Sequence, residues 1–250
     1  MVLQGRLISI LKLLEQRQTV TVGELCDELG VSESTVRRDL VILEEKGKLI
    51  RVHGGAAITE DSLLNYERDV RTKSEINIRE KDMIGRYAAQ LIEDDDVVFI
   101  DAGTTTDKLV DYISKSSATF FTNGIEHAKK LNAKGLNVII LGGKVKQNTE
   151  AVVGASAAAY ISKLNFTKCF LGTNGISRKS GFTTPDCEEA LIKETAAKNS
   201  LKVFVLADNS KFGIISTVSF CDIDGACIIT DKVKSEKYLK STQIKEVSER

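Results

Sequence analysis

The sequence predicts a two-domain chain: a winged helix-turn-helix (α with a β wing) in residues 1–58 and a larger α/β domain in residues 77–250. Three helical periodicities followed by a short hairpin pattern fill the first segment. In the second, short β-rich runs alternate with helical stretches, which predicts right-handed crossovers and a mainly parallel sheet. The polar, densely charged residues 59–76 between the two are predicted to be a linker.

The composition is typical of a globular chain with a sizeable core, since 42% of its 250 residues are hydrophobic and 28% are charged. The 35 Lys and Arg residues balance the 35 Asp and Glu residues, so net charge gives no support to nucleic-acid binding. No apolar run reaches the roughly 20 residues that span a bilayer, and no signal-peptide cleavage site follows the N-terminus. We therefore expect a cytoplasmic protein without membrane contact.

Five cysteines and two histidines give little support to a disulfide framework or a zinc site. The cysteines are odd in number and scattered, and no C-x-x-C pair occurs. We expect buried free thiols in a reducing compartment, no metal site and no cofactor. The cysteines are Cys26, Cys169, Cys187, Cys221 and Cys227.

Local signals define the first two helices. Apolar residues at helical spacing predict a first helix around Leu7–Leu14. Thr21, with Glu24 three positions later, has the capping-box arrangement and predicts the start of a second helix. Gly30 is expected to end that helix in the left-handed conformation that glycine adopts without strain.

A third helix, capped by Ser32 and ended by Gly47, carries the residues that we expect to meet DNA. Its first turns are rich in Ser, Thr and Arg, and in a helix-turn-helix these residues lie against base edges in the major groove. Residues 49–58 predict a hairpin wing that turns at Gly54–Gly55 and reaches phosphate or the minor groove. The expected DNA contacts are Ser32, Ser34, Thr35, Arg37, Arg38, Arg51 and His53.

The periodicity also fits a small helical domain that does not bind DNA, because three-helix units also serve as protein-docking modules. Residues 37–53 contain five basic and three acidic side chains, an excess of only two. The contiguous stretch ELCDELGVSESTVRRDLVILEEKGKLIRVHGGA, however, resembles the signature of the DeoR family of bacterial regulators across its whole length. This resemblance implies that the first domain binds DNA.

Six β-rich runs of the second domain are each followed by a loop or a helical stretch. Ligands of parallel α/β sheets bind outside the carboxyl ends of the strands, so we expect these loops to converge on one pocket. The runs are residues 97–100, 118–121, 137–141, 168–172, 202–207 and 226–230.

The chemistry of these loops fits a phosphorylated polyol. Asp101 would accept hydrogen bonds from hydroxyls, and Gly103 at a helix N-terminus would favour an anion. Thr184-Pro185 is expected to start a helix that carries Glu189 and Lys193 on one face. Each motif alone also fits turn chemistry or solvated ion pairs, but their number on one side of one sheet favours a site. The predicted ligand contacts are Asp101, Gly103, Thr104, Thr105, Thr122, Asn123, Gly142, Gly143, Lys144, Gly172, Asn174, Gly175, Thr184, Glu189, Lys193, Asp208 and Lys211.

Residues 77–235 also resemble the DeoR-family sensor domain, which resembles ribose 5-phosphate isomerase in fold. The matching stretches are IDAGTTT, TNG, LGG, FLGTNGIS, GFTTPD, EEALIKE and ADNSKFG. In the family, such residues bind a phosphosugar effector that changes DNA affinity. The combination of GTNGIS, GFTTPD and EEALIK looks most like the fructose-operon repressors, whose effector is fructose 1-phosphate. Related repressors answer to glycerol 3-phosphate, tagatose 6-phosphate or deoxyribose 5-phosphate.

The resemblance implies a non-enzymatic repressor of a sugar operon, bound to operator DNA as a homodimer or homotetramer and released by a phosphosugar. Helix-turn-helix dimers reach half-sites about 34–36 Å apart. The residues alone leave open a sugar-phosphate isomerase with a DNA-binding appendage. Asp101, Glu189 or Asp208 would be its base, with Lys193 or Lys211 beside it. An activator, or a scaffold that binds no DNA, also remains open.

Overall fold

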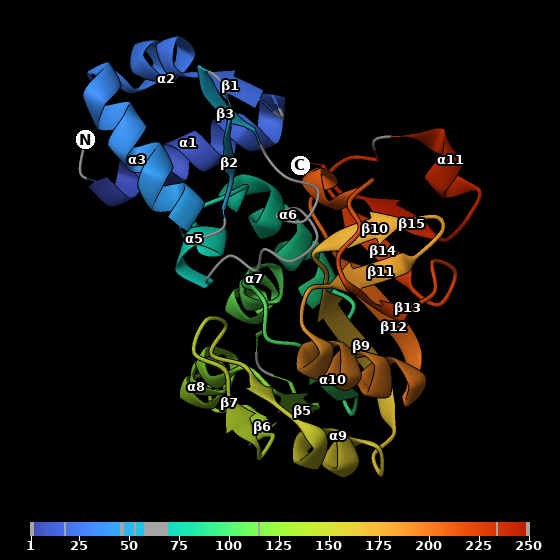
Figure 1. The fold of residues 1–250 in the computed structure, drawn as a ribbon. Coiled ribbons are helices and arrows are strands. Elements are labelled where there is room, and N and C mark those ends of the chain that lie inside the picture. The colour runs from blue at the N-terminus through green and yellow to red at the C-terminus, as the bar shows by residue number, and fades with distance from the viewer. Residues whose placement is uncertain are drawn as a thin grey trace. The chain divides into compact units, whose positions relative to one another are not determined.

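The computed structural model divides into two compact units, Met1–Tyr66 and Glu67–Arg250, drawn in Figure 1. Predictions for Gly47, His53 and residues 58–69 fall outside the part that it describes. The described residues are 3–17, 19–45, 48–52, 54–57, 70–114, 116–233 and 235–248.

The first unit is the predicted winged helix-turn-helix. Its three strands form an antiparallel sheet in the order β1-β3-β2. Strand β1 was not predicted, because only four residues separate α1 from α2, too few to show an alternating pattern. The elements are α1 (Leu3–Arg17), β1 (Thr19–Thr21), α2 (Val22–Leu29), α3 (Glu33–Glu45), β2 (Ile50–Val52) and β3 (Gly55–Ala57).

The predicted signals at both ends of α2 are confirmed. Thr21 Oγ1 accepts from the Glu24 backbone N–H at 3.2 Å, and the Thr21 N–H donates to Glu24 Oε2 at 2.8 Å. Gly30 follows α2 with a φ of 62°, as expected of a left-handed cap. A buried ion pair joins α1 to α3, since Arg6 Nε donates to Asp39 Oδ2 at 2.8 Å. These bonds fix where α3 begins and which face it turns to solvent.

The second unit is built on a parallel seven-stranded sheet, with strand order β15-β14-β12-β9-β4-β5-β6 and every neighbouring pair parallel. This confirms the predicted fold class. The strands are β4 (Val97–Ile100), β5 (Thr119–Thr122), β6 (Asn137–Ile140), β9 (Phe166–Gly172), β12 (Ser200–Leu206), β14 (Cys227–Thr230) and β15 (Ile244–Glu246).

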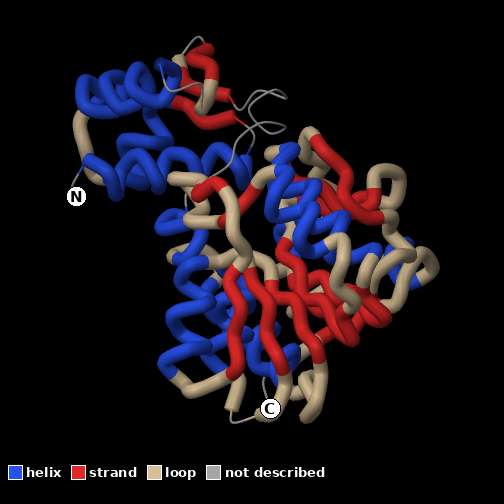
Figure 2. Tube along the Cα trace, turned by 90° about the horizontal axis from the view of Figure 1, so that it is seen from below, coloured by secondary structure: helices blue, strands red, loops and turns tan. Residues whose placement is uncertain are grey.

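Helices lie on both faces of this sheet, as Figures 1 and 2 show. Strand residues alternate between two cores: Val98 packs with Leu109 on one face, whereas Phe99 packs with Ile192 on the other. The helices are α5 (Val70–Ser74), α6 (Ile78–Ala89), α7 (Thr104–Tyr112), α8 (Ile125–Ala133), α9 (Ala155–Ile161), α10 (Cys187–Lys198), the 3-10 helix η1 (Asn209–Lys211) and α11 (Glu236–Leu239). In the part of the chain that the structure describes, no helix is both long enough and apolar enough to cross a membrane.

Two smaller sheets, which the sequence did not predict, stand beside the large one. One pairs β7 (Lys144–Val145) with β8 (Val152–Val153), and the other contains β10 (Gly175–Ser177), β11 (Gly181–Thr184) and β13 (Val218–Cys221). The segment from Gly175 to Thr184 is therefore a hairpin and not the loop that we expected.

The predicted start of α10 at Thr184-Pro185 is wrong. Thr184 ends β11, and α10 begins at Cys187 after Asp186, whose side chain accepts the Glu189 backbone N–H at 2.9 Å. An aspartate oxygen satisfies a free N–H of the first turn, which explains why the cap moves to Asp186.

The prediction of buried thiols is also wrong for Cys187, which is exposed as the first residue of α10.

Candidate DNA interface and ligand site

The start of α3 presents polar side chains to solvent. Ser32, Ser34, Arg37 and Arg38 are exposed, whereas Thr35 is half-buried. Ser32 Oγ lies 3.0 Å from the hydroxyl oxygens of both Ser34 and Thr35, so the three hydroxyls form one cluster. Such groups are available to phosphate oxygens and base edges.

Arg51 of the wing joins the same face. Arg37, Arg38 and Arg51 line a groove of about 500 Å³ between α3 and β2. The wing is held to α3 because Arg51 donates its backbone N–H to Glu44 at 3.0 Å and its Nε at 2.6 Å. These two bonds hold the pKa of Glu44 below its ordinary value. Arg37 pairs with Glu33 at 3.1 Å, in an exposed pair of the kind worth little in water, so its guanidinium is available for DNA.

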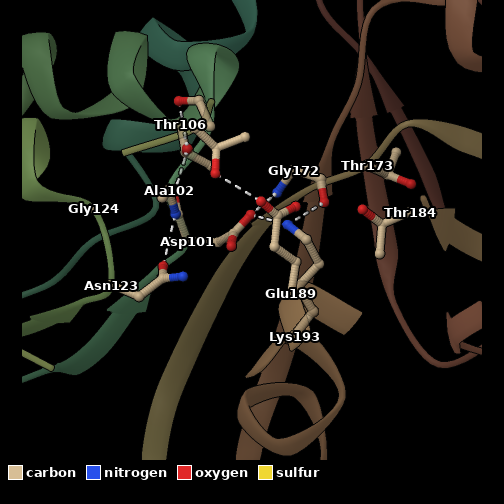
Figure 3. A network of polar contacts seen from close by, with 12 residues as sticks. Asp101, Ala102, Thr106, Asn123, Gly124, Gly172, Thr173, Thr184, Glu189 and Lys193 are labelled. Carbon is tan, nitrogen blue, oxygen red and sulfur yellow. Dashed lines mark hydrogen bonds and ion pairs between the residues drawn. The ribbon is translucent and has the colours of Figure 1, made fainter. Parts of the chain in front are cut away.

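A buried ion pair lies where β4 and β9 end (Figure 3). Lys193 Nζ donates to Asp101 Oδ2 and, at 3.1 Å, to the Gly172 carbonyl. The Gly172 N–H donates to the same Asp101 oxygen at 3.1 Å. Burial raises the pKa of Asp101, while Lys193 acts against that rise. The predicted residues Asp101, Gly172 and Lys193 are thus brought into direct contact.

Glu189, one turn before Lys193 on α10, is the second buried carboxylate of this cluster. It accepts from Thr149 Oγ1 at 2.8 Å and from Lys146 Nζ at 3.2 Å. Burial opposes ionisation, but the charges of Lys193, Lys146 and Lys73 hold the pKa of Glu189 below its ordinary value. Sequence patterns did not predict Thr149, Lys146 and Lys73, because none of them lies in a loop that leads from a strand to a helix.

The N-terminus of α7 lies beside Asp101. Gly103 at its N-cap carries no side chain, so no side-chain cap covers the first N–H groups, which favour an anion. Thr106 Oγ1 donates back to the Asp101 carbonyl at 2.6 Å and lies 3.1 Å from His127 Nε2. Burial lowers the pKa of His127 to about 4, so this imidazole is neutral at pH 7 and positions the turn without adding charge.

Asp208 follows β12, which neighbours β9 in the sheet. Its Oδ1 accepts from Asn77 Nδ2 at 2.9 Å and from the Ser210 backbone N–H at 3.0 Å. Its Oδ2 is buried and has no hydrogen-bond partner among the described residues. Burial opposes ionisation, but Lys211 and hydrogen bonds from Ser210 keep the pKa of Asp208 below its ordinary value. A buried carboxylate oxygen without a donor is a natural acceptor for a ligand hydroxyl.

Other predicted contacts hold the fold around the cluster. Thr122 Oγ1 donates to the Ile100 carbonyl at 2.7 Å. Asn123 accepts the Ala102 N–H at 2.8 Å and so fixes the loop after β4. Thr184 Oγ1 lies 3.3 Å from Asn174 Oδ1, on the hairpin that faces Gly172 in Figure 3.

The residues predicted as ligand contacts in the loop after β6 do not join the cluster. Gly142 and Gly143 are exposed. Lys144 is also exposed and pairs with Glu188 at 2.9 Å. Lys146, two residues later, is the lysine of this loop that reaches Glu189.

The fold and these two sites define a helix-turn-helix protein with a separate α/β ligand-binding unit. The DeoR-like helix-turn-helix domain matches residues 6–62, and the DeoR C terminal sensor domain matches residues 76–232. The chain therefore belongs to the DeoR family of transcriptional regulators.

Its relatives are regulators that match over nearly their full length. A HTH-type transcriptional regulator FruR of Bacillus subtilis, described as uncharacterized, is 41% identical over 95% of this chain and 96% of the relative. A lactose phosphotransferase system repressor of Staphylococcus epidermidis is 38% identical over 97% of each chain. The regulator IolR of Bacillus subtilis is 35% identical over 88% of each.

Among solved structures, ribose 5-phosphate isomerase A from Methanocaldococcus jannaschii aligns with a TM-score of 0.41 and 12% identity. The alignment covers 54% of this chain and 55% of the isomerase, so the chain spans about half of the isomerase's length. We draw no functional argument from this likeness.

Proposed function

We propose that the chain represses a sugar uptake or catabolic operon and is released from its operator by a phosphosugar. The observation that carries this proposal is the buried cluster of Asp101, Lys193 and Glu189 at the carboxyl ends of the parallel strands. Buried charges are costly, and perturbed charged groups cluster at functional sites. The exposed arginines of α3 and the wing supply the DNA-binding half.

The two ends of a phosphosugar match two kinds of group in the site. The first N–H groups of α7, together with nearby lysines, suit the phosphate. Asp208 Oδ2 and Glu189 suit the sugar hydroxyls, because carboxylates accept strong hydrogen bonds. The remaining predicted contacts around Gly172 and Thr184 would then set the shape of the pocket.

The favoured effector is fructose 1-phosphate, because the stretches GTNGIS, GFTTPD and EEALIK resemble those of fructose-operon repressors. The test is a titration of the full chain on the DNA upstream of its own gene, followed by fluorescence anisotropy at fixed salt. Fructose 6-phosphate, glucose 6-phosphate, glycerol 3-phosphate and tagatose 6-phosphate run in parallel. Selective release by fructose 1-phosphate supports the proposal. Release by another ester alone would keep the proposed repressor function and replace fructose 1-phosphate with that ester as the effector.

Replacing Lys211 by alanine is expected to leave operator affinity unchanged and to weaken release by the effector. Lys211 supplies positive charge next to Asp208, at the carboxyl end of β12. Lys202 is the matched control, because it is exposed near the amino end of the same strand. Normal release in Lys211→Ala would remove this lysine from the effector site.

Replacing Arg37 by alanine is expected to weaken operator binding by about 1–3 kcal/mol, the usual cost of losing a base contact. Arg17→Ala is the control, since this exposed arginine lies at the end of α1 and pairs with Glu28. Operator affinity is measured by anisotropy for both variants. Equal affinities in the two would show that α3 is not the reading helix.

We propose that the protein binds as a homodimer or homotetramer, with half-sites about 34–36 Å apart as two-fold helix-turn-helix binding requires. Domain limits of 1–58, 59–76 and 77–250 remain our proposal for the reader, the linker and the sensor.

Sugar-phosphate isomerisation is favoured by one observation, the unpartnered Asp208 Oδ2, which is placed to act as a base. The relatives are named as regulators, and Asp101 is held by Lys193 and Gly172 instead of being poised to take a proton. We infer binding without turnover. A coupled isomerase assay on the purified chain decides this, and sustained turnover would overturn our inference.

A further inference from the structure

One short loop touches both the candidate ligand site and the first described helix of the second unit. Residues 146–150, here called the coupling loop, connect β7 to β8. On one side Thr149 Oγ1 donates to Glu189 at 2.8 Å, and Lys146 Nζ donates to the same oxygen at 3.2 Å. Both Thr149 and Glu189 are buried, so water does not replace these bonds freely.

On its other side the coupling loop holds α5. The Asn148 carbonyl accepts the backbone N–H of Val70, the first residue of α5, at 3.0 Å. The first N–H groups of a helix have no partner within the helix, so this bond satisfies one of them. α5 in turn contacts α6, because the Lys73 carbonyl accepts from Lys81 Nζ.

The coupling loop is closed on itself and is expected to move as a unit. The Lys146 N–H donates to the Ala151 carbonyl at 2.9 Å, and the Glu150 N–H donates to the Lys146 carbonyl at 2.8 Å. Glu150 has a φ of 52°, in the left-handed region. A displacement of Lys146 and Thr149 therefore displaces Asn148 between them, because the loop has little internal freedom.

We propose that the coupling loop transmits occupancy of the ligand site to α5, through Glu189 on one side and the Asn148–Val70 hydrogen bond on the other. This inference rests on the proposed function. The phosphate of a bound phosphosugar competes with Glu189 for Lys146, displaces the coupling loop and weakens its hold on α5. In the chain, α5 directly follows residues 58–69, which lead from the DNA-binding unit.

The mechanism satisfies the requirement that a ligand favour one of two states. Lys146 is shared between Glu189 and Asp186, at 3.2 and 2.8 Å. A phosphate offers the same lysine a stronger acceptor, so the displaced loop position binds the ligand better. Only that difference in affinity, and not the binding itself, shifts DNA affinity.

The first test is Val70→Pro, which deletes the N–H that Asn148 accepts. Proline is favoured at the first position of a helix, so α5 itself is retained. Val70→Ala is the control, because it shortens the side chain and keeps the N–H. Operator affinity of the full chain is measured with and without saturating fructose 1-phosphate, and ester binding is measured separately by thermal shift.

Because Val70→Pro removes the bond that the ester is proposed to weaken, we expect this variant to bind the ester as the wild type does, but to bind the operator weakly even without ester and to lose most of the change in operator affinity on ester binding. Allosteric changes of this kind are about 5- to 150-fold. Val70→Ala should respond as the wild type does. Normal release in Val70→Pro would overturn the proposal.

The second test needs no ligand and therefore separates this inference from the proposed function. In Thr149→Val the loop loses its bond to Glu189, so amide hydrogens of residues 70–74 should exchange severalfold faster than in the wild type. The control is Thr195→Val, on α10 but bonded only to the Leu191 carbonyl. Unchanged exchange in Thr149→Val overturns the coupling. If no ester binds the wild type, the proposed function fails and the exchange rates alone decide the link.

Discussion

Lys193→Met is expected to lower the free energy of unfolding of the second unit by about 3–5 kcal/mol, the usual cost of removing one partner from a buried ion pair. The variant leaves Asp101 buried, with the Gly172 N–H still donating to its Oδ2. Methionine keeps most of the side-chain volume, so the loss measures charge and not a cavity. Urea unfolding at pH 7 gives the value, with the exposed Lys202→Met as the control that should stay within about 0.5 kcal/mol.

The loss of unfolding free energy in Lys193→Met should become smaller as the pH falls. Burial raises the pKa of Asp101, and without Lys193 that rise is opposed less strongly. A carboxyl group whose pKa is higher in the folded than in the unfolded state favours folding when protonated. The loss of stability is therefore complete above the pKa that Asp101 has in the folded variant. It disappears below the pKa of an unfolded aspartate, about 3.9. The double variant Asp101→Asn/Lys193→Met should recover part of the loss at pH 7, and equal stability of the double and single variants would contradict this account.

The sequence predicted those parts of the fold that depend on local patterns. Thr21, Glu24 and Gly30 fix the ends of α2 through contacts within a few residues, so their roles were readable. Six of the seven parallel strands were readable too, although β9 and β12 each begin two residues earlier than expected, and β15 was not predicted. Phe166 of β9 is buried in the core but is separated from the apolar run by Thr167 and Lys168, whereas Ser200 and Leu201 at the start of β12 are not buried.

Features that depend on distant partners were not predicted. Asp39 counts as one more surface acid in the sequence, yet it is buried because Arg6, 33 residues away, pairs with it. The hairpin of β10 and β11 was taken for a loop because its Gly, Thr and Ser residues resemble turn residues. Pairing with β13, which lies more than 30 residues later, makes it a sheet.

The site shows the same division. Asp101, Gly172 and Lys193 follow the rule that ligand groups gather at the carboxyl ends of parallel strands. Lys146 and Thr149 break that rule, because they reach Glu189 from a hairpin that the rule does not include. No spacing in the sequence distinguishes Lys146 from the exposed Lys144, since only the tertiary contact with α10 does so.

Gly85→Ala is expected to destabilise the second unit by about 1–3 kcal/mol, although alanine is the better helix former. α6 and α7 cross at Gly85, where a Cβ atom would lie 2.6 Å from the Leu109 nitrogen and 2.6 Å from the Lys108 carbonyl carbon. Backbone atoms cannot turn aside as a side chain does, so the helices must separate. Alanine favours a helix over glycine by only about 1 kcal/mol. The overlap of its Cβ atom with the α7 backbone costs more than this, so the net effect on stability is a loss.

The same substitution should weaken ligand binding, because α7 carries Gly103 at its N-terminus and moves when α6 is pushed away. Gly142→Ala is the matched control in this unit, since a Cβ there meets nothing within 4 Å. Urea unfolding and ester-induced thermal shift are measured on both variants. A Gly85→Ala protein as stable as the Gly142→Ala protein would mean that α6 and α7 separate at little cost. In that case α7 could not be the rigid element that holds the anion-binding turn in place.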